Sequence, residues 1–335
     1  MKFRTSRVKT NFKTFESSWI EKRTLTQHAV NALEDLPLAE EARNRLESIR
    51  PRFPDLVGWE PLGQGSCTIN AGDLQGVFDS SNGSIVSLVS PTIDTHWADE
   101  GHPLGVLSYQ TFSASDYERF FSQYILPEMQ TSFWAREDFT KPGLELAKPV
   151  SRIWKPAVKA SYARRTHLEA ERLFRLVFDC EATARYGAPR EVFLHYRFPI
   201  DQSLIRIELQ WFGKPACRMP EAVWFGFTPN FSEVGKWSMD KLGRTISPLE
   251  VVRNGNKHLH AVGRDIDLVY SENRLRITPL DSPLVAPGVP SLLDFDNEDP
   301  DLSAGMNFCL LNNVWGTNFP MWFEEDCRFR FEIAF

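Results

Sequence analysis

Trp315, Asn313 and Asn318 lie within the segment 306–323, where aromatic rings are interleaved with amide side chains between two strand-like runs. Rings offer flat apolar faces for stacking, and amides offer hydrogen-bond donors and acceptors at fixed spacing. A pyranose needs both, because it has an apolar C–H face and a rim of hydroxyls. The segment therefore predicts ligand-binding roles for these three residues. The alternative is an aromatic-rich pair of strands whose asparagines cap turns.

Two other places carry groups that could bind a ligand. The first is the segment 96–105, which reads HWADEGHPLG, and the second is the pair His258 and His260. No nucleophilic Ser or Cys motif lies near the first, so a catalytic triad is unsupported. We interpret it either as a structured loop with Trp97 packed inside or as a loop that reaches a neighbouring domain. Residues i and i+2 of a strand share a face, so the two imidazoles could meet one metal. No third ligand is nearby, and simple hydrogen bonding is the alternative. Trp97 and His260 join the candidate ligand-binding residues.

Two acidic runs supply no catalytic site. Residues 294–301 lack the glycine and the bidentate glutamate of a calcium loop, so we expect a solvated loop. Residues 324–326 are three adjacent acids, whereas a glycosidase needs two carboxylates about 5–9 Å apart across the scissile bond. We assign no catalytic residue, and we expect no glycosidase activity from this chain alone.

Composition excludes several classes of protein. A net charge of −6 and a pI of about 5.7 do not suggest a nucleic-acid partner. The five cysteines are widely spaced and form no CxxC pair, which favours free thiols in a reducing compartment. The GxGxxG, P-loop and HExxH motifs do not occur, so we expect no metal or other cofactor in this chain. No run is long enough to cross a bilayer and no secretory segment follows Met1, which predicts a cytoplasmic, membrane-free protein.

The elements that must position these residues are two helices followed by many strands. Apolar residues recur at helical spacing over 16–36 and 38–49, and a proline ends each run, which predicts a helical hairpin. Two short helices cannot bury all their apolar side chains, so part of this stripe should face water. The predicted divisions are a basic tail at 1–13, the helical hairpin at 14–50, a linker at 51–65 and a β domain at 66–335.

The β domain has the sequence texture of a large sandwich. Aromatic residues make up 13% of the chain, and aromatics pack well on pleated faces. Alternation of apolar and polar side chains is plain in residues 204–211, where Ile205, Ile207, Leu209 and Trp211 share one phase, and Asn82-Gly83 is a strong hairpin signal. One helix is expected within 112–130, where aromatic residues share a stripe. The fold class is therefore predicted to be mainly β, with strands near 306–312 and 327–334 closing the chain.

The order of several segments resembles a known family. Residues 74–88 are similar to the first β-hairpin in the C-terminal region of glycoside hydrolase family 38, the α-mannosidases. Residues 312–319 resemble that family's late N-x-W-x-T-N-F segment. The likeness to an uncharacterised branch, the domain of unknown function 5054 group, is closer still. It is carried by residues 109–117, 258–262 and 281–285, and by 15–59, which resemble the end of that group's helical bundle.

The resemblance implies a galactose-mutarotase-like β-supersandwich at 66–335, preceded by the remnant of a helical bundle. In family 38, the zinc ion and the Asp nucleophile lie on an N-terminal barrel that would precede residue 1. No His-x-Asp zinc motif occurs here, so no catalytic residue is carried over, and zinc would belong to that barrel. The family's β region packs beneath the barrel and lends loops to the site. The implied partners are therefore a carbohydrate and a separate or upstream catalytic barrel.

Three hypotheses remain open at this point. The chain is the C-terminal, non-catalytic portion of an α-mannosidase-like glycoside hydrolase, or it is a free-standing carbohydrate-binding β module. The third hypothesis is a sugar epimerase on the mutarotase-like fold, which needs a His base and a Glu within one cleft. His258, His260 and Glu325 are the pairing that the sequence offers for it.

Overall fold

The computed structural model describes residues 12–34, 36–63, 67–90, 95–231, 236–270, 272–316, 321 and 323–335. Most of the predicted basic tail and the candidate residue Asn318 lie outside this part of the chain. The predicted division into domains stays a prediction.

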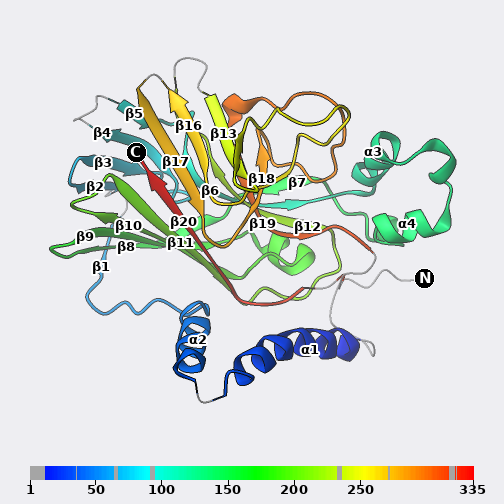
Figure 1. Cartoon of the computed structure of the whole chain (residues 1–335), viewed down its shortest axis with the longest axis horizontal. Coiled ribbons are helices and arrows are strands. Elements are labelled where there is room, and N and C mark those ends of the chain that lie inside the picture. The colour runs from blue at the N-terminus through cyan, green and yellow to red at the C-terminus, as the bar shows by residue number, and fades with distance from the viewer. Residues whose placement is uncertain are drawn as a thin grey trace.

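Antiparallel strands build the body of the molecule in two ten-stranded sheets (Figure 1). This confirms the predicted mainly β class. The first sheet contains, in spatial order, β1 (Glu60–Pro61), β8 (Ala157–Arg165), β9 (Glu169–Val177), β10 (Glu191–Pro199), β11 (Leu204–Phe212), β20 (Cys327–Ala334), β17 (Asn273–Pro279), β16 (Ile266–Tyr270), β13 (Lys236–Lys241) and β14 (Arg244–Ile246).

Most strands of the second sheet follow one another in a single spatial order, and two short strands pair beside that order. Its spatial order is β15 (His260–Ala261), β18 (Leu284–Pro287), β19 (Met306–Asn313), β12 (Glu221–Phe227), β6 (Leu104–Thr111), β4 (Ile85–Ser90), β3 (Leu74–Phe78) and β2 (Thr68–Ala71), while β5 (Thr95–Ala98) pairs with β4 and β7 (Arg152–Trp154) pairs with β6.

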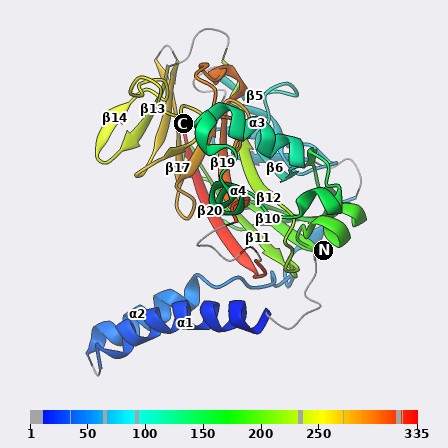
Figure 2. The ribbon, with the colours of Figure 1, turned by 90° about the vertical axis from the view of Figure 1, so that its right-hand side faces the viewer.

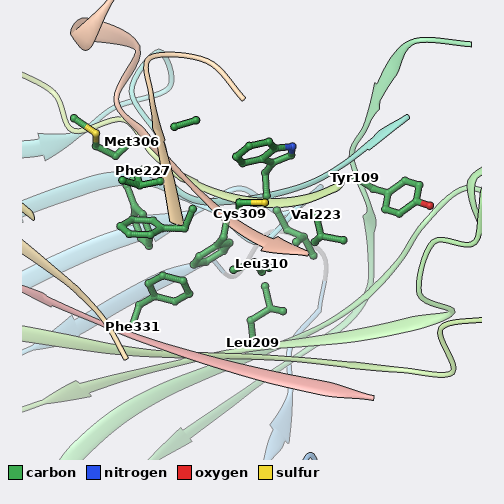
Figure 3. Close-up of a cluster of buried hydrophobic side chains, with 14 of the residues drawn as sticks. Tyr109, Leu209, Val223, Phe227, Met306, Cys309, Leu310 and Phe331 are labelled. Carbon is green, nitrogen blue, oxygen red and sulfur yellow. The ribbon is translucent and has the colours of Figure 1, made fainter. Parts of the chain in front are cut away.

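The core lies between the sheets, and side-chain alternation decides which residues of β11 enter it. In β11, Ile205, Ile207, Leu209 and Trp211 are buried in the core, as the alternation predicted. Figure 3 shows part of this core, where side chains from both sheets, including Leu209 and Phe331 of the first and Val223 of the second, meet in a continuous apolar layer.

The other phase of the same strands gives the first sheet a polar outer face. Arg206, Glu208 and Gln210 of β11 alternate with its buried residues and lie on this face. A small second apolar cluster also lies there, formed by Leu173, Phe193 and Phe212. The residues of β10 and β20 that pair with Arg206, Glu208 and Gln210 extend this face across the two neighbouring strands.

Helices occur at the N-terminus and in one insertion between β6 and β7. Helices α1 (Phe12–Asn31) and α2 (Pro37–Ser48) form the predicted hairpin. The helix expected within 112–130 is shorter: α3 spans Ala114–Tyr124 and ends there, and a second helix, α4 (Phe133–Phe139), follows that the sequence did not predict. Short 3-10 helices are η1 (Pro127–Met129), η2 (Leu144–Ala147) and η4 (Leu302–Ala304), and η3 (Ala182–Tyr186) is a short π-helix.

The α1–α2 hairpin lies beyond the edge of the β body in both views (Figures 1 and 2). An ion pair between Arg23 and Glu325 ties it to the segment before β20, and a hydrogen bond from Arg328 of β20 to the Ser48 carbonyl, at 2.6 Å, ties it to the first sheet. The expected exposure of its apolar side chains is confirmed, since Ile20 is 61% exposed and Ile49 is 48% exposed.

Replacing Ile20 and Leu25 together by serine should weaken self-association of the purified chain. Both side chains are more than half exposed on α1, and burying one Ile or Leu contributes roughly 1.5–3 kcal/mol. We expect the dissociation constant measured by sedimentation velocity to rise by about tenfold or more. The matched control is Leu242→Ser, which removes an exposed leucine from the turn between β13 and β14. Equal self-association of all three proteins would contradict the prediction.

Candidate functional site

A cleft of about 360 Å³ lies on the outer face of the first sheet, within the usual size range of small-ligand sites. Its floor is formed by β9, β10 and β11, which contribute Leu173, His195 and Gln210. Its wall is the segment 48–59, which runs from the end of α2 to β1. The cleft therefore lies at the junction between the helical hairpin and the β body.

Specific contacts hold this wall against the sheet. The ring of Phe53 stacks on Phe212 with 3.9 Å between centroids and 18° between planes. The backbone N–H of Arg52 donates to the Gln210 side-chain oxygen over 2.8 Å. A linker that needed only to span two elements would not require these contacts, so the wall is a defined part of the cleft.

Trp59 brings an aromatic face into the cleft. Its ring packs edge to face on His195, with 5.3 Å between centroids, and the guanidinium of Arg164 lies over the ring at 4.5 Å. The cation–π contact holds the ring plane in place. Trp59 is half-buried, so part of the indole stays accessible.

Glu171 lies beneath the cleft and binds two of the polar side chains that line it, Arg164 and His195. Its two carboxylate oxygens accept bonds from Arg164 at 2.6 and 3.0 Å, and His195 Nε2 lies 2.8 Å from the second oxygen. Burial alone would raise the pKa of Glu171, but the hydrogen bonds from His195 and Arg164 outweigh it and lower that pKa to about 2. The carboxylate stays ionised near neutral pH and orients the imidazole.

A second ion pair borders the cleft on β11 and β20. Arg328 Nε donates to Glu208 over 2.8 Å, and Gln210 Nε2 donates to the other Glu208 oxygen over 2.9 Å. Each charge deep in the cleft is thus matched by a partner on the sheet. An aromatic face beside fixed, planar donors and acceptors suits a polar ligand rich in hydroxyl groups.

The structure places Asn313 in a buried polar cluster that does not line the cleft. Its amide donates to Glu221 Oε1 at 3.0 Å and to the Cys217 carbonyl at 3.1 Å, and its oxygen accepts from Lys141 Nζ at 2.7 Å. Lys214 Nζ completes an ion pair with Glu221 at 2.8 Å. All four of these polar side chains are buried, so Asn313 serves a network of side chains in the fold.

Tyr109 shares the same carboxylate. Its hydroxyl donates to Glu221 Oε2 at 2.6 Å, and burial together with the charge of Glu221 raises the pKa of Tyr109 well above its ordinary value. The lysines also bond to the segment after β19: Lys141 Nζ donates to the Met321 carbonyl at 3.3 Å and Lys214 Nζ to the Phe323 carbonyl at 3.4 Å. The cluster therefore anchors part of the aromatic and amide segment.

The other predicted ligand-binding residues do not gather at one place. Trp315 is half-buried and packs on Phe120 of α3 and Phe139 of α4, with 5.4 and 6.3 Å between ring centroids. Trp97 is buried on β5 against Phe335, and His260 is buried on β15, at the end of the second sheet. Ligand binding by Trp97, His260, Asn313, Trp315 and Asn318 stays a prediction.

The two histidines of the HxH pair have separate hydrogen-bond partners. His258 Nε2 lies 2.8 Å from an Asp296 oxygen, and His260 Nε2 lies 3.1 Å from the Lys257 carbonyl. Glu325, which the sequence offered as their partner in an epimerase, pairs with Arg23 of α1. Within the described part of the chain, no group of three His, Cys, Asp or Glu side chains could hold a metal ion.

The cleft residues Trp59, His195 and Gln210, and Glu171 beneath them, were missed from the sequence. One signal was available: His195 and Gln210 occupy the solvent phase of strands whose other phase is apolar. Trp59 gave no such signal because it lies in the predicted linker. Glu171 gave none because it follows Ala170 in a strand pattern without special features.

Comparison with known proteins identifies both a family and a fold. The family described as Domain of unknown function (DUF5054) matches residues 1–207. An α-mannosidase from Enterococcus faecalis V583 shares the fold with a TM-score of 0.50 and 7% identity, over 82% of this chain and 30% of that chain. These two findings confirm the resemblance inferred from the sequence.

Further solved structures are similar at a lower level. A glycosyl hydrolase family 38 protein from Enterococcus faecalis has a TM-score of 0.48 at 9% identity, with 85% of this chain and 31% of that chain covered. A galactose mutarotase-like protein from Lactobacillus casei ATCC 334 has a TM-score of 0.41 at 11% identity, with 82% and 100% covered. The chain thus spans less than a third of the two Enterococcus proteins.

No curated protein matches the sequence. No helix in the described part of the chain is long and apolar enough to span a bilayer.

Proposed function

The chain belongs to the DUF5054 family, and on that premise we propose that it is a non-catalytic, carbohydrate-binding portion of an α-mannosidase-like glycoside hydrolase. The observation that carries the proposal is the cleft between segment 48–59 and the outer face of the first sheet. It offers the accessible ring of Trp59 beside the polar groups of His195, Gln210 and Arg328. This is the combination of stacking face and hydroxyl partners that a pyranose requires.

The length of the matched α-mannosidase supports the proposal that this chain is a portion of a larger glycoside hydrolase. The α-mannosidase with the shared fold is much longer than this chain, which covers 30% of it. In a longer protein, a catalytic barrel could cover the apolar side chains of the α1–α2 hairpin. Such a partner explains why Ile20 and Ile49 remain exposed here.

A free-standing carbohydrate-binding module is the alternative that uses the same cleft. A sugar epimerase is a third candidate, and one observation favours it: His195, which lines the cleft, is oriented by the buried carboxylate of Glu171 beneath the cleft floor. An oriented imidazole could move a proton at an anomeric hydroxyl. Chemical exchange between mannose anomers, followed by NMR with and without the protein, would distinguish the epimerase from the two binding proteins.

Trp59→Ala should abolish weak sugar binding while the fold persists. We expect wild-type affinity for mannose near 1 mM, roughly −4 kcal/mol, because one cleft offers few contacts. Titration of mannose into labelled protein, followed by NMR at the indole N–H groups, should shift the Trp59 signal. Trp59→Phe should keep part of the affinity, since a smaller ring still stacks.

The matched control is Trp134→Ala, which removes a partly exposed indole from α4, outside the cleft. Circular dichroism of each variant establishes that it remains folded. A mannose-dependent shift at Trp315 in place of Trp59 would move the site to the segment predicted from the sequence. The absence of any indole shift at 20 mM mannose, about 20 times the expected Kd, would overturn the proposal.

A further inference from the structure

The cleft is longer than one sugar ring requires. Its lining crosses five adjacent strands of the first sheet, from Arg164 on β8 to Arg328 on β20. Neighbouring strands lie about 4.8 Å apart, so these four steps span about 19 Å of the outer face. A single pyranose stacked on Trp59 would fill only part of that length.

Two aromatic rings of the wall lie at different positions along this floor. The Trp59 ring packs on His195, whereas the Phe53 ring contacts Phe193, with 6.0 Å between centroids, and stacks on Phe212. Phe193 is two residues before His195 on β10, and Phe212 pairs with the residue four before it. These steps correspond to about 7 and about 14 Å along the strand. One pyranose is too small to stack on both rings.

Each of the two rings is supported by the protein and still accessible to a ligand. Phe212 lies parallel to Phe53 on one side, with 3.9 Å between centroids, yet Phe53 is 61% exposed. The guanidinium of Arg164 lies over the half-buried Trp59 ring. A ring held in this way loses little freedom when an apolar sugar face packs on it. Both rings therefore suit stacking.

Polar side chains accompany both ring positions on the next strand. In the pairing of β10 with β11, Glu208 lies opposite His195 and Gln210 lies opposite Phe193. A hydrogen bond of 2.9 Å joins Gln210 Nε2 to a Glu208 oxygen, which fixes the two side chains relative to each other. A carboxylate and an amide can bond to hydroxyl groups as acceptor and donor. Partners for hydroxyls thus continue from one ring position to the other.

We propose that the cleft contains two subsites and that its ligand is an oligosaccharide of at least two linked pyranose units. One unit stacks on Trp59, and the chain extends over Gln210 toward Phe53. This inference rests on the proposed carbohydrate-binding function, which by itself requires only the Trp59 subsite. It adds the class of ligand and a binding role for Phe53.

A purely structural role of Phe53 is the competing explanation. Its stacking on Phe212 helps to hold the segment 48–59 against the sheet, and that role needs no ligand. Phe53→Leu keeps an apolar contact with Phe212 but removes the flat face, whereas Phe53→Tyr keeps the ring. If the leucine variant still binds mannose at Trp59, the wall is in place, so the two roles can be separated.

The test is a titration of the full chain with mannose, methyl α-mannoside and a set of α-linked mannobioses. We expect the best mannobiose to bind about tenfold more tightly than mannose, and methyl α-mannoside to bind like mannose because it lacks a second ring. Phe53→Leu should reduce the preference to less than about threefold, with mannose affinity and the melting temperature unchanged. Phe53→Tyr should keep it. The matched control is Phe133→Leu, which removes an exposed ring of α4.

The outcomes separate this inference from the proposed function. Equal affinity for mannose and every mannobiose would overturn the second subsite and leave carbohydrate binding intact. A preference that persists in Phe53→Leu would also overturn it, because the second unit would then bind elsewhere. Loss of mannose binding in Phe53→Leu would show that the ring only holds the wall. Binding of none of these sugars by the wild type would refute the proposed function and this inference together.

Discussion

Glu221→Gln should lower the free energy of unfolding by about 3–5 kcal/mol, because it leaves a buried cation without its partner. Lys214 and Glu221 form an ion pair at 2.8 Å, and both side chains are completely buried. Glutamine keeps the shape and some hydrogen bonds of Glu221 but removes its charge. Lys141, held at the same cluster through Asn313, would lose the nearest compensating charge as well.

Denaturant unfolding at neutral pH measures this loss. The matched control is Glu118→Gln, since Glu118 pairs with Arg136 at the surface and its side chain is 63% exposed. Exposed pairs contribute about 1 kcal/mol or less, so this control should stay near wild type. Combining Glu221→Gln with Lys214→Met should recover part of the stability, because the buried charge and its partner are then both gone. A loss below 1 kcal/mol for Glu221→Gln would show that water reaches the cluster.

Patterns along the chain predicted the fold well where the pattern was local. The alternation in 204–211 placed Ile205, Ile207 and Leu209 in the core, and the helical stripe within 112–130 located α3. Both signals depend on backbone periodicity, which a single segment contains in full. α4 was missed because seven residues carry too little periodicity to identify a helix.

The sites were harder to predict because their residues come from distant strands. Lys141 and Asn313 are separated by 172 positions, and His195 and Glu171 by 24. Each pairing depends on which strands lie side by side and in which register. The type of residue was informative at Asn313, but its neighbours decide its environment: they make it a buried partner of lysine and glutamate. Trp59 became a cleft residue only because segment 48–59 docks on the outer face of the first sheet.

Lys141→Met should remove a pH dependence of stability that the wild-type chain shows between pH 7 and 9. Burial lowers the pKa of Lys141 from 10.5 to about 7, with the charge of Glu221 opposing the shift. Above pH 7 the unfolded chain keeps this proton and the folded chain releases it. The unfolding free energy therefore rises with pH, by up to about 1.4 kcal/mol per pH unit from this one group. Below pH 7 both states are protonated, and the group adds no slope.

The quantity to compare is the stability of wild type minus that of Lys141→Met, measured by denaturant unfolding at pH 7, 8 and 9. We expect the difference to grow in favour of wild type by about 2–3 kcal/mol over this range. The variant also loses the hydrogen bonds of Lys141 to Asn313 and Met321. That loss changes the unfolding free energy by the same amount at every pH, so the dependence of the difference on pH is unaffected. The window ends at pH 9 because burial raises the pKa of Cys309 to about 12, and such thiols lower stability as pH rises further.

The control Lys159→Met removes an exposed lysine of β8 and should run parallel to wild type. If Lys141→Met also ran parallel, Lys141 would hold its proton throughout the range, and Glu221 would be compensating two cations. In that case Glu221→Gln should cost more at pH 7 than at pH 9, where loss of the Glu221 charge would allow one lysine to discharge. If instead the slopes differ as expected, Lys141 is close to neutral above pH 7, and the cluster reduces to one ion pair between Lys214 and Glu221. The two experiments thus determine how many charges the fold buries beside the segment that follows β19.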